Sequence, residues 1–297
     1  MSSSASAHDD VKRQWHHYRR ELERAARAGE TAANYEGQAA RPPSTMQPFR
    51  ERMAALHRRI EQRHYACARL YQLHALRLQR WRASNTPAVR PVFMAAVAED
   101  LGVVGAAITL FDDRRQELLT ASSDARSSAA HDIEATVGQG PSHDVVNGID
   151  SVVVEAADLA ARWPEYGRGA IDLGIGSVVA VPLTTGLGRL GTLCGFSEEP
   201  RLPEGTVLTA GRIADALAND VLLDEQLMSV DGIAADGGLF DDADYLTTVN
   251  QAVGMVAAQG PYSIDTALVL MRARAFADGM SLAELARRVL EEGYRLC

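Results

Sequence analysis

The order of helical and strand patterns between residues 92 and 228 constrains the fold of this chain more than any other feature. A short helical pattern at 92–102 comes first, and an amphipathic helical pattern at 204–228 comes last. Between them, strand patterns lie at 105–113, at 116–124, from 151 onward, and twice within 177–199. Asp112 and Asp113 have the chemistry of a hairpin turn. Helices flanking strands that tight turns connect predict an α+β domain on an antiparallel sheet, which we place at residues 91–228.

Residues 1–90 are expected to form a helical N-terminal extension with a linker. Trp15, Tyr18 and Leu22 recur at helical spacing and predict a short helix at 10–28. Residues 29–47 lack such periodicity and contain two adjacent prolines, so they are expected to form a linker. Residues 48–83 predict a long helix.

An apolar seam follows the predicted helix at 48–83, but charged and histidine side chains interrupt it. The seam contains Met53, Leu56, Ile60, Cys67, Leu70 and Trp81, and the interruptions are Arg63, His74 and Arg77. A broken heptad disfavours a stable isolated coiled coil. We therefore expect this helix to pack with the helix at 204–228, beside it or across a two-fold axis, in a homodimer.

The charge of the chain is divided unevenly. Residues 1–90 hold 17 basic and 8 acidic side chains, a net charge of +9, whereas the remainder carries −18. A basic arm on an acidic body has two candidate partners, an external anion such as nucleic acid or the body itself. A third interpretation is a solvated helical arm with no partner.

Residues 241–297 are expected to form three short helices after a Gly/Asp-rich hinge at 229–240. Ser263 is a suitable N-cap for the second helix, and Ser281 with Glu284 forms a capping-box pattern at the third. The apolar stripes are Leu246, Val249, Val253 and Val256; Ile264, Ala267, Leu268 and Met271; and Leu282, Leu285, Ala286 and Val289. So small a bundle has a thin core and is expected to lean on a neighbour.

No pattern in the sequence indicates catalysis. The three cysteines are widely spaced and match neither a metal site nor a disulfide framework. Residues 136–141 contain two glycines without a following lysine and predict a tight turn. Adjacent Ser142 and His143 do not have the spacing of a nucleophile and its base, and Cys194 is expected to be buried on a strand. We therefore expect a non-enzymatic protein with no metal and no cofactor.

The N-terminus has neither the basic start nor the apolar core of a secretory signal, and no apolar run approaches the roughly 20 residues that cross a bilayer. These features favour a cytoplasmic protein without a membrane partner.

Residues 91–228 resemble a GAF domain of the kind common in actinobacterial regulators. The resemblance rests on Gly140-Pro141, on Arg162-Trp163-Pro164, on the strand at 177–183, and on Leu190-Gly191-Thr192-Leu193. It implies a sensory module with a pocket on one face of the sheet. The Asn-Lys-Phe-Asp-Glu signature of cyclic-nucleotide binders is absent, so an unknown small-molecule ligand and a purely structural, dimerising domain both stay open.

Residues 241–293 resemble an ANTAR domain. The matching positions are Ala252 and Gly254 in the first helix, Ala267, Met271, Arg272 and Ala275 in the second, and Leu282, Leu285 and Ala286 in the third. This resemblance implies transcription antitermination, in which the bundle binds a pair of RNA stem-loops in a nascent transcript. Val253 and Gln259 occupy positions where the family usually carries positive charge.

Four arginines are the candidate RNA-binding residues, because phosphate neutralisation carries much of RNA affinity. They are Arg272, Arg274, Arg287 and Arg288. Residues 241–297 hold five arginines against eight acids, a net charge of −3. The main hypothesis is therefore a signal-responsive GAF–ANTAR antitermination regulator. The alternatives are a protein-interaction scaffold with a degenerate RNA-binding face, and nucleic-acid contact through the basic N-terminal arm.

Overall fold

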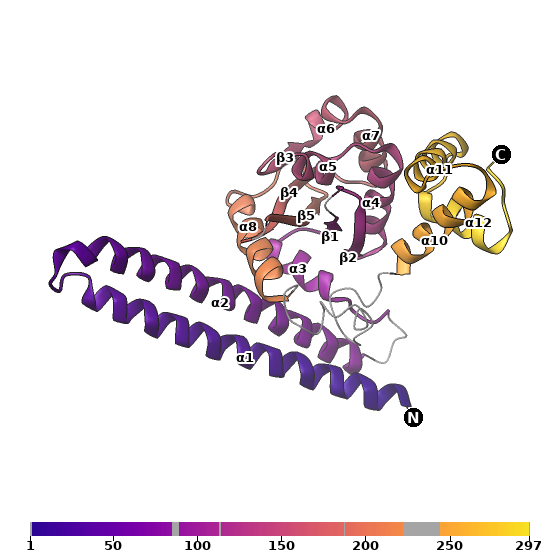
Figure 1. Ribbon diagram of the computed structural model, residues 1–297. Coiled ribbons are helices and arrows are strands. Elements are labelled where there is room, and N and C mark those ends of the chain that lie inside the picture. The colour runs from indigo at the N-terminus through magenta and orange to yellow at the C-terminus, as the bar shows by residue number, and fades with distance from the viewer. Residues whose placement is uncertain (1, 85–88, 113, 187, 222–243, 297) are drawn as a thin grey trace.

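The computed structural model describes residues 2–84, 89–112, 114–186, 188–221 and 244–296. The chain forms, in order, a long helical hairpin, an α+β domain around a five-stranded sheet, and a compact group of three helices (Figure 1). The expected α+β fold class is confirmed. The hinge expected at 229–240 lies outside the described residues.

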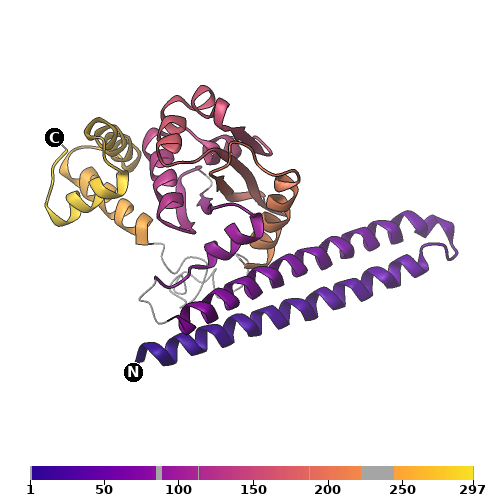
Figure 2. The ribbon, with the colours of Figure 1, turned by 180° about the vertical axis from the view of Figure 1, so that it is seen from behind.

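The N-terminal hairpin consists of α1 (Ser2–Gln38), a short 3₁₀ turn (Ser44–Met46) and α2 (Gln47–Ala83). The two long helices pack side by side and project well beyond the rest of the protein (Figures 1 and 2). The expected linker at 29–47 was wrong over its first ten residues, which belong to α1. Gly29 and Ala32 are buried there, and a Cβ on Gly29 would meet the Glu61 side chain at 2.5 Å. Close packing on α2 thus outweighs the low helix propensity of glycine.

Ion pairs inside the protein use much of the basic charge of the hairpin. Buried Glu21 lies 2.7 Å from His64 Nδ1 and 2.8 Å from Arg24 Nη1. Arg58 pairs with Glu36 at 2.8 Å.

Other arginines of α2 reach the acidic residues at the end of α3 (Phe93–Leu101). Arg77 pairs with Glu99 at 2.6 Å, and Arg69 pairs with Asp100. The basic arm therefore forms ion pairs with the acidic body of the same chain, which was one of its candidate partners.

The sheet has the strand order β2-β1-β5-β4-β3, and its four strand pairs are antiparallel. Its strands are β1 (Gly105–Phe111), β2 (Glu117–Ser122), β3 (Val152–Glu155), β4 (Ser177–Thr185) and β5 (Gly188–Ser197). The Asp112 carboxylate accepts the N–H groups of Arg114 and Gln116, so Asp112 is the expected hairpin-turn residue. Asp113 lies outside the described residues.

Two layers of helices cover the two faces of the sheet (Figure 1). One face packs on α2, α3 and α8 (Thr206–Ala216), which continues as a π-helical turn (Leu217–Val221). The expected packing of the second N-terminal helix on the closing helix is therefore present within one chain. The expected extension of that closing helix to 228 lies partly outside the described residues.

The other face carries four short helices. They are α4 (Ala125–Val137), α5 (Pro141–Val146), α6 (Ala156–Arg162) and α7 (Pro164–Asp172). The predicted tight turn at 136–141 is only partly correct, because α4 ends at Val137 and α5 begins at Pro141. The sequence did not predict α4, which has almost no apolar stripe.

The C-terminal bundle consists of α10 (Asp244–Gln259), α11 (Ile264–Asp278) and α12 (Leu282–Glu291). The Ser263 and Ser281 side chains cap α11 and α12, each accepting a backbone N–H three residues later. The predicted stripes form the core, except that Ile264 is exposed. The side chain of Leu246 lies outside the described residues.

Val253 is only 3% exposed, so it belongs to this core and not to a solvent-facing binding surface.

Within the described residues, no helix has the length and apolar character that crossing a membrane requires.

Candidate functional site

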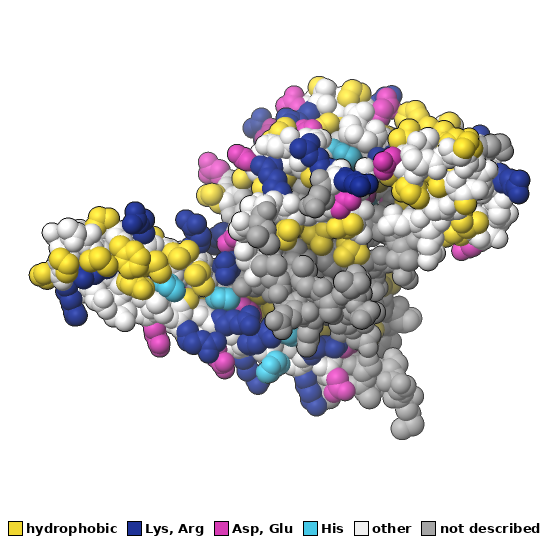
Figure 3. All heavy atoms as spheres, viewed as in Figure 1, with side chains coloured by type: hydrophobic (Ala, Val, Ile, Leu, Met, Phe, Trp, Pro, Cys, Tyr) yellow, Lys and Arg dark blue, Asp and Glu magenta, His cyan; other side chains and the backbone are white. Residues whose placement is uncertain are grey.

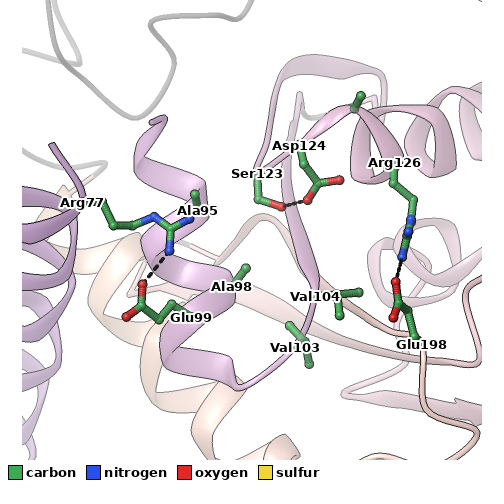
Figure 4. A pocket seen from close by; sticks show the side chains of 11 residues that line it. Arg77, Ala95, Ala98, Glu99, Val103, Val104, Ser123, Asp124, Arg126 and Glu198 are labelled. Carbon is green, nitrogen blue, oxygen red and sulfur yellow. Dashed lines mark hydrogen bonds and ion pairs between the residues drawn. The ribbon is translucent and has the colours of Figure 1, made fainter. Parts of the chain in front are cut away.

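A surface cleft of about 670 Å³ lies between α3 and the start of α4 (Figure 4). Most of its charged side chains are already paired with one another. Arg77 contacts Glu99 across one wall, and Arg126 contacts Glu198 across the other. The remaining charged side chain, Asp124, accepts hydrogen bonds from Ser123 Oγ and from the backbone N–H of Ser127. A charged ligand would therefore have to displace existing ion pairs or hydrogen bonds.

A more unusual chemistry lies inside the α+β domain, between the sheet and α4. His131 on α4 is buried, and its Nε2 lies 3.5 Å from Glu117 Oε2 and 3.2 Å from Thr120 Oγ1. Its Nδ1 lies 3.5 Å from Thr109 Oγ1. Burial opposes the charge on both groups, but mutual attraction prevails: the pKa of Glu117 is lowered and that of His131 is raised. A buried ion pair therefore links β2 to α4.

One turn further along α4, Glu134 is also buried. Burial raises the pKa of its carboxyl to about 7, although the backbone N–H of His143 donates to Oε1 at 3.0 Å. Gly140 has a φ of +154°, and a Cβ there would lie 2.8 Å from the Glu134 carboxyl. The Gly140-Pro141 turn thus allows α5 to close directly over this carboxyl.

The residues around Glu134 are polar, although strands and helices enclose them. Ser142 Oγ lies 3.2 Å from Cys194 Sγ, and Cys194 is buried as the sequence predicted. Burial raises the pKa of the Cys194 thiol and of the Tyr166 phenol, so both stay protonated. Among the described residues, Tyr166 Oη and His143 Nε2 are buried and have no hydrogen-bond partner.

Sequence reasoning missed His131 and Glu134 as members of a site. Both lie on the buried face of α4, three residues apart, together with small side chains at Ser127, Ala130 and Ala135. Ionisable residues at helical spacing among small residues are the only signal that the sequence offered. Hydrophobic periodicity does not detect such a face.

The structure brings two of the four predicted RNA-binding arginines together. The guanidinium carbon of Arg288, on α12, lies 4.8 Å from the centroid of the Tyr294 ring, and that of Arg274, on α11, lies 5.7 Å from it. Arg274 also pairs with Asp278 at the end of α11, at 2.8 Å, and Arg288 pairs with Glu292, the residue that follows α12, at 3.4 Å. We call Arg274, Arg288 and Tyr294 the arginine–tyrosine cluster.

The other two predicted arginines do not join this cluster. Arg287 is exposed on α12. Arg272 is half-buried and lines a second cleft, of about 510 Å³, between the β1–β2 hairpin and the bundle. Gln259 is half-buried as well, and its side-chain amide donates to the Tyr294 carbonyl at 3.4 Å.

No group of three or more His, Cys, Asp or Glu side chains within the described parts of the chain is placed to hold a metal ion.

Comparison with known proteins identifies the central domain. A family model described as "GAF domain" matches residues 92–219, and no ANTAR model matches the C-terminal helices. The chain matches no curated protein.

Several solved structures are similar to part of this chain, among them the following two. A domain of a two-component sensor histidine kinase protein from Sinorhizobium meliloti 1021 is 22% identical, with a TM-score of 0.31, and the match covers 42% of this chain and 82% of that one. The GAF domain of an Acinetobacter phosphoenolpyruvate-protein phosphotransferase is 16% identical, with a TM-score of 0.31, and the match covers 50% of this chain and 90% of that one. On the strength of the family match, residues 92–219 form a GAF domain.

Proposed function

We propose that this protein is a cytoplasmic, signal-responsive transcription antitermination regulator. In this proposal the GAF domain receives the signal, and the C-terminal bundle acts as an ANTAR domain that binds stem-loop pairs in nascent RNA. The observation that carries the proposal is the arginine–tyrosine cluster, in which two helices and the C-terminal segment place two guanidinium groups over one aromatic ring.

This cluster suits single-stranded loop nucleotides better than a duplex groove. Unstacked bases stack on tyrosine rings and on guanidinium planes, while arginines neutralise the neighbouring phosphates. Asp278 and Glu292 pair with the two arginines in the absence of RNA, so binding must exchange these ion pairs for phosphate contacts. Exposed ion pairs are weak, on the order of 1 kcal/mol or less, so the exchange is energetically accessible.

The sensory site within this proposal is the polar interior around Glu134. Tyr166 Oη and His143 Nε2 are buried polar atoms without a partner among the described residues, and a small polar ligand would satisfy such atoms. A protonated Glu134 can donate a hydrogen bond as well as accept one. We therefore infer a small, uncharged polar molecule as the ligand class, with no resident cofactor.

The test of RNA binding compares an RNA that contains two adjacent stem-loops with an unstructured RNA of equal length, at several salt concentrations. The Arg274→Ala/Arg288→Ala double variant removes two phosphate contacts, so the slope of log affinity against log salt should fall by about 2. The matched control is Arg201→Ala/Arg212→Ala, which removes two exposed arginines of the GAF domain.

The proposal requires that the wild type prefers the stem-loop pair and that only the cluster variant loses this preference. Equal binding of both RNAs by the wild type would overturn the antitermination function. Equal losses in the cluster variant and in the control would show that binding depends on overall charge alone.

One observation favours the alternative, a protein-interaction scaffold. Val269 and Phe276, seven residues apart on α11, are 63% and 55% exposed. Residues seven apart lie on one face of a helix, and exposed apolar side chains on one face mark protein contacts. If the wild type shows no stem-loop preference, and Val269→Ser/Phe276→Ser abolishes capture of a protein partner, the scaffold function replaces the first proposal.

A further inference from the structure

The C-terminal bundle packs directly on the GAF domain. α10 contacts β2, the edge strand of the sheet, while α11 and α12 contact α4 (Figure 1). The cleft of about 510 Å³ lies at this junction. Glu117 and Leu118 of β2 line it on one side, and Val253, Leu268 and Arg272 line it on the other. An exposed edge strand invites unwanted pairing, so the bundle also shields β2.

Arg272 differs from the other arginines of the bundle in its environment. Arg274 is exposed beside Asp278, and Arg288 is half-buried beside Glu292 and over the Tyr294 ring, so each has a partner within the bundle. Arg272 is half-buried, and its Nε is buried without a hydrogen-bond partner among the described residues. A partly desolvated guanidinium is costly unless an anion compensates it. Glu117 is a carboxylate that lines the same cleft, from the other domain.

Glu117 connects this cleft to the interior of the GAF domain. Its Oε2 lies 3.5 Å from Nε2 of His131, which in turn contacts Thr120 and Thr109 across two strands. The positive charge of Arg272 favours the ionised form of Glu117 and lowers its pKa, after the larger effects of burial and of His131. Charges of alternating sign therefore run from α11, through Glu117, to His131 on α4.

We propose that Arg272 couples the bundle to the GAF domain by docking against Glu117, and that it is not an RNA contact. A ligand-induced shift of α4 moves His131 and hence Glu117, which weakens the hold on Arg272 and frees the bundle. This coupling rests on the proposed function only in taking the C-terminal bundle to be the RNA-binding domain that the GAF domain regulates. It gives Arg272 a positioning role, whereas the sequence alone had made Arg272 a candidate RNA-binding residue.

The first experiment measures docking by hydrogen exchange in the full-length protein. Arg272→Ala should speed exchange in β2 and in the adjoining face of α11 by about five-fold, because it weakens the closed state. Glu117→Gln should speed exchange at least as much, because it also breaks the buried pair with His131. The double variant should exchange little faster than Glu117→Gln alone, since Glu117→Gln already removes the contact that Arg272→Ala removes. Arg272→Lys, which keeps the charge but loses the planar fork, should lie between the wild type and Arg272→Ala.

Arg274→Ala is the matched control, because it removes an arginine two residues away that faces Tyr294. Exchange in β2 should stay at the wild-type rate in this variant. A wild-type rate in Arg272→Ala, or fully additive effects in the double variant, would overturn the proposal. Circular dichroism establishes that each variant is folded, and unchanged exchange in the central strands β4 and β5 of Arg272→Ala establishes that its faster exchange in β2 is local.

The second experiment separates docking from RNA recognition. Arg272→Ala should bind the stem-loop RNA at least as tightly as the wild type, whereas Arg274→Ala/Arg288→Ala should bind it more weakly. Weaker RNA binding by Arg272→Ala, with unchanged exchange in β2, would make Arg272 an RNA contact and refute the coupling role. If no variant binds RNA, the proposed function fails, while the exchange result still decides whether Arg272 docks the bundle.

Discussion

The carboxylate of Glu117, on the edge strand β2, lies 3.5 Å from Nε2 of His131 on α4, and their side chains are 8% and 4% exposed. A pair this deeply buried balances a large desolvation penalty against mutual attraction. Each buried charge is therefore stabilised by the other, and removing either one breaks the ion pair that joins the sheet to α4.

Replacing His131 with leucine should destabilise the protein by about 3 kcal/mol, because the Glu117 carboxylate is left buried with weaker compensation. The Glu117→Leu/His131→Leu double variant should recover much of this loss. Urea unfolding of the single and double variants provides the measurement. Equal or greater destabilisation of the double variant would show that packing, and not charge, determines the effect.

The contribution of this pair should also depend on pH. The lowered pKa of Glu117 gives stability that is present above 4.5, its ordinary value, and is lost as pH falls through the folded-state pKa. The raised pKa of His131 gives stability that is present below 6.5 and is lost as pH rises through the folded-state pKa. The stability difference between wild type and His131→Leu should therefore be greatest between about pH 4.5 and 6.5.

The pH dependence of stability that arises from Glu134 should be opposite to that from Glu117. Its pKa rises from 4.5 to about 7 on folding, so the folded state binds the proton more tightly than the unfolded state. The stability that protonated Glu134 contributes is fully present below pH 4.5 and is lost as pH rises through about 7. This loss is on the order of 3 kcal/mol. Glu134→Gln keeps an acceptor for the N–H of His143 and should remove this dependence.

The measurement is the difference in unfolding free energy between wild type and Glu134→Gln from pH 4.5 to 7.5. Taking the difference cancels groups that do not interact with Glu134, such as His74, whose pKa burial lowers to about 4. A difference that does not change with pH would contradict a protonated Glu134. A ligand that donates a hydrogen bond to this carboxyl should shift the transition to lower pH.

Local patterns were sufficient to predict the bundle and most of the sheet. The caps at Ser263 and Ser281 depend only on neighbouring backbone groups, and the apolar stripes of α10 and α12 face a single core. Such elements carry their own signals in sequence. The antiparallel hairpins followed from alternation and from turn residues such as Asp112.

The missing parts depend on contacts between distant segments. The extension of α1 to Gln38 depends on a face of small residues against α2, which no local propensity encodes. The role of Arg272 shows the same limit. The sequence places it on α11 beside Arg274, but only the docking of the bundle on β2 turns one arginine into the cleft and leaves the other at the surface.

Restoring a positive charge at position 253 should fail. Val253 occupies a position where ANTAR domains usually carry positive charge, but its side chain is buried in the bundle core. A lysine there must desolvate its ammonium group or distort the packing, at a cost of about 2–4 kcal/mol. Thermal unfolding and hydrogen exchange in α10–α12 should detect the loss, whereas Gln251→Lys, at an exposed position of α10, should leave both unchanged.

Finally, we propose that the projecting end of the helical hairpin pairs with a second copy of the chain. Phe49 and Leu56, seven residues apart and so on one face of α2, are exposed, and apolar side chains gather on the hairpin where it projects past the GAF domain (Figure 3). Further along the same helix, Cys67 and Leu70 are buried against the GAF domain. The exposed apolar stripe is therefore the continuation of a helix face that is buried elsewhere in the protein.

A two-fold axis would bring two such stripes together, because an isologous contact needs only one self-complementary surface. We expect a homodimer in light scattering at tens of micromolar. Leu56→Arg should convert the protein to a monomer, since it places two like charges near the axis. Val269→Arg, which adds the same charge at an exposed apolar position of α11, should remain dimeric. A wild type that is monomeric at this concentration, or a Leu56→Arg variant that stays dimeric, would exclude the stripe as the dimer contact.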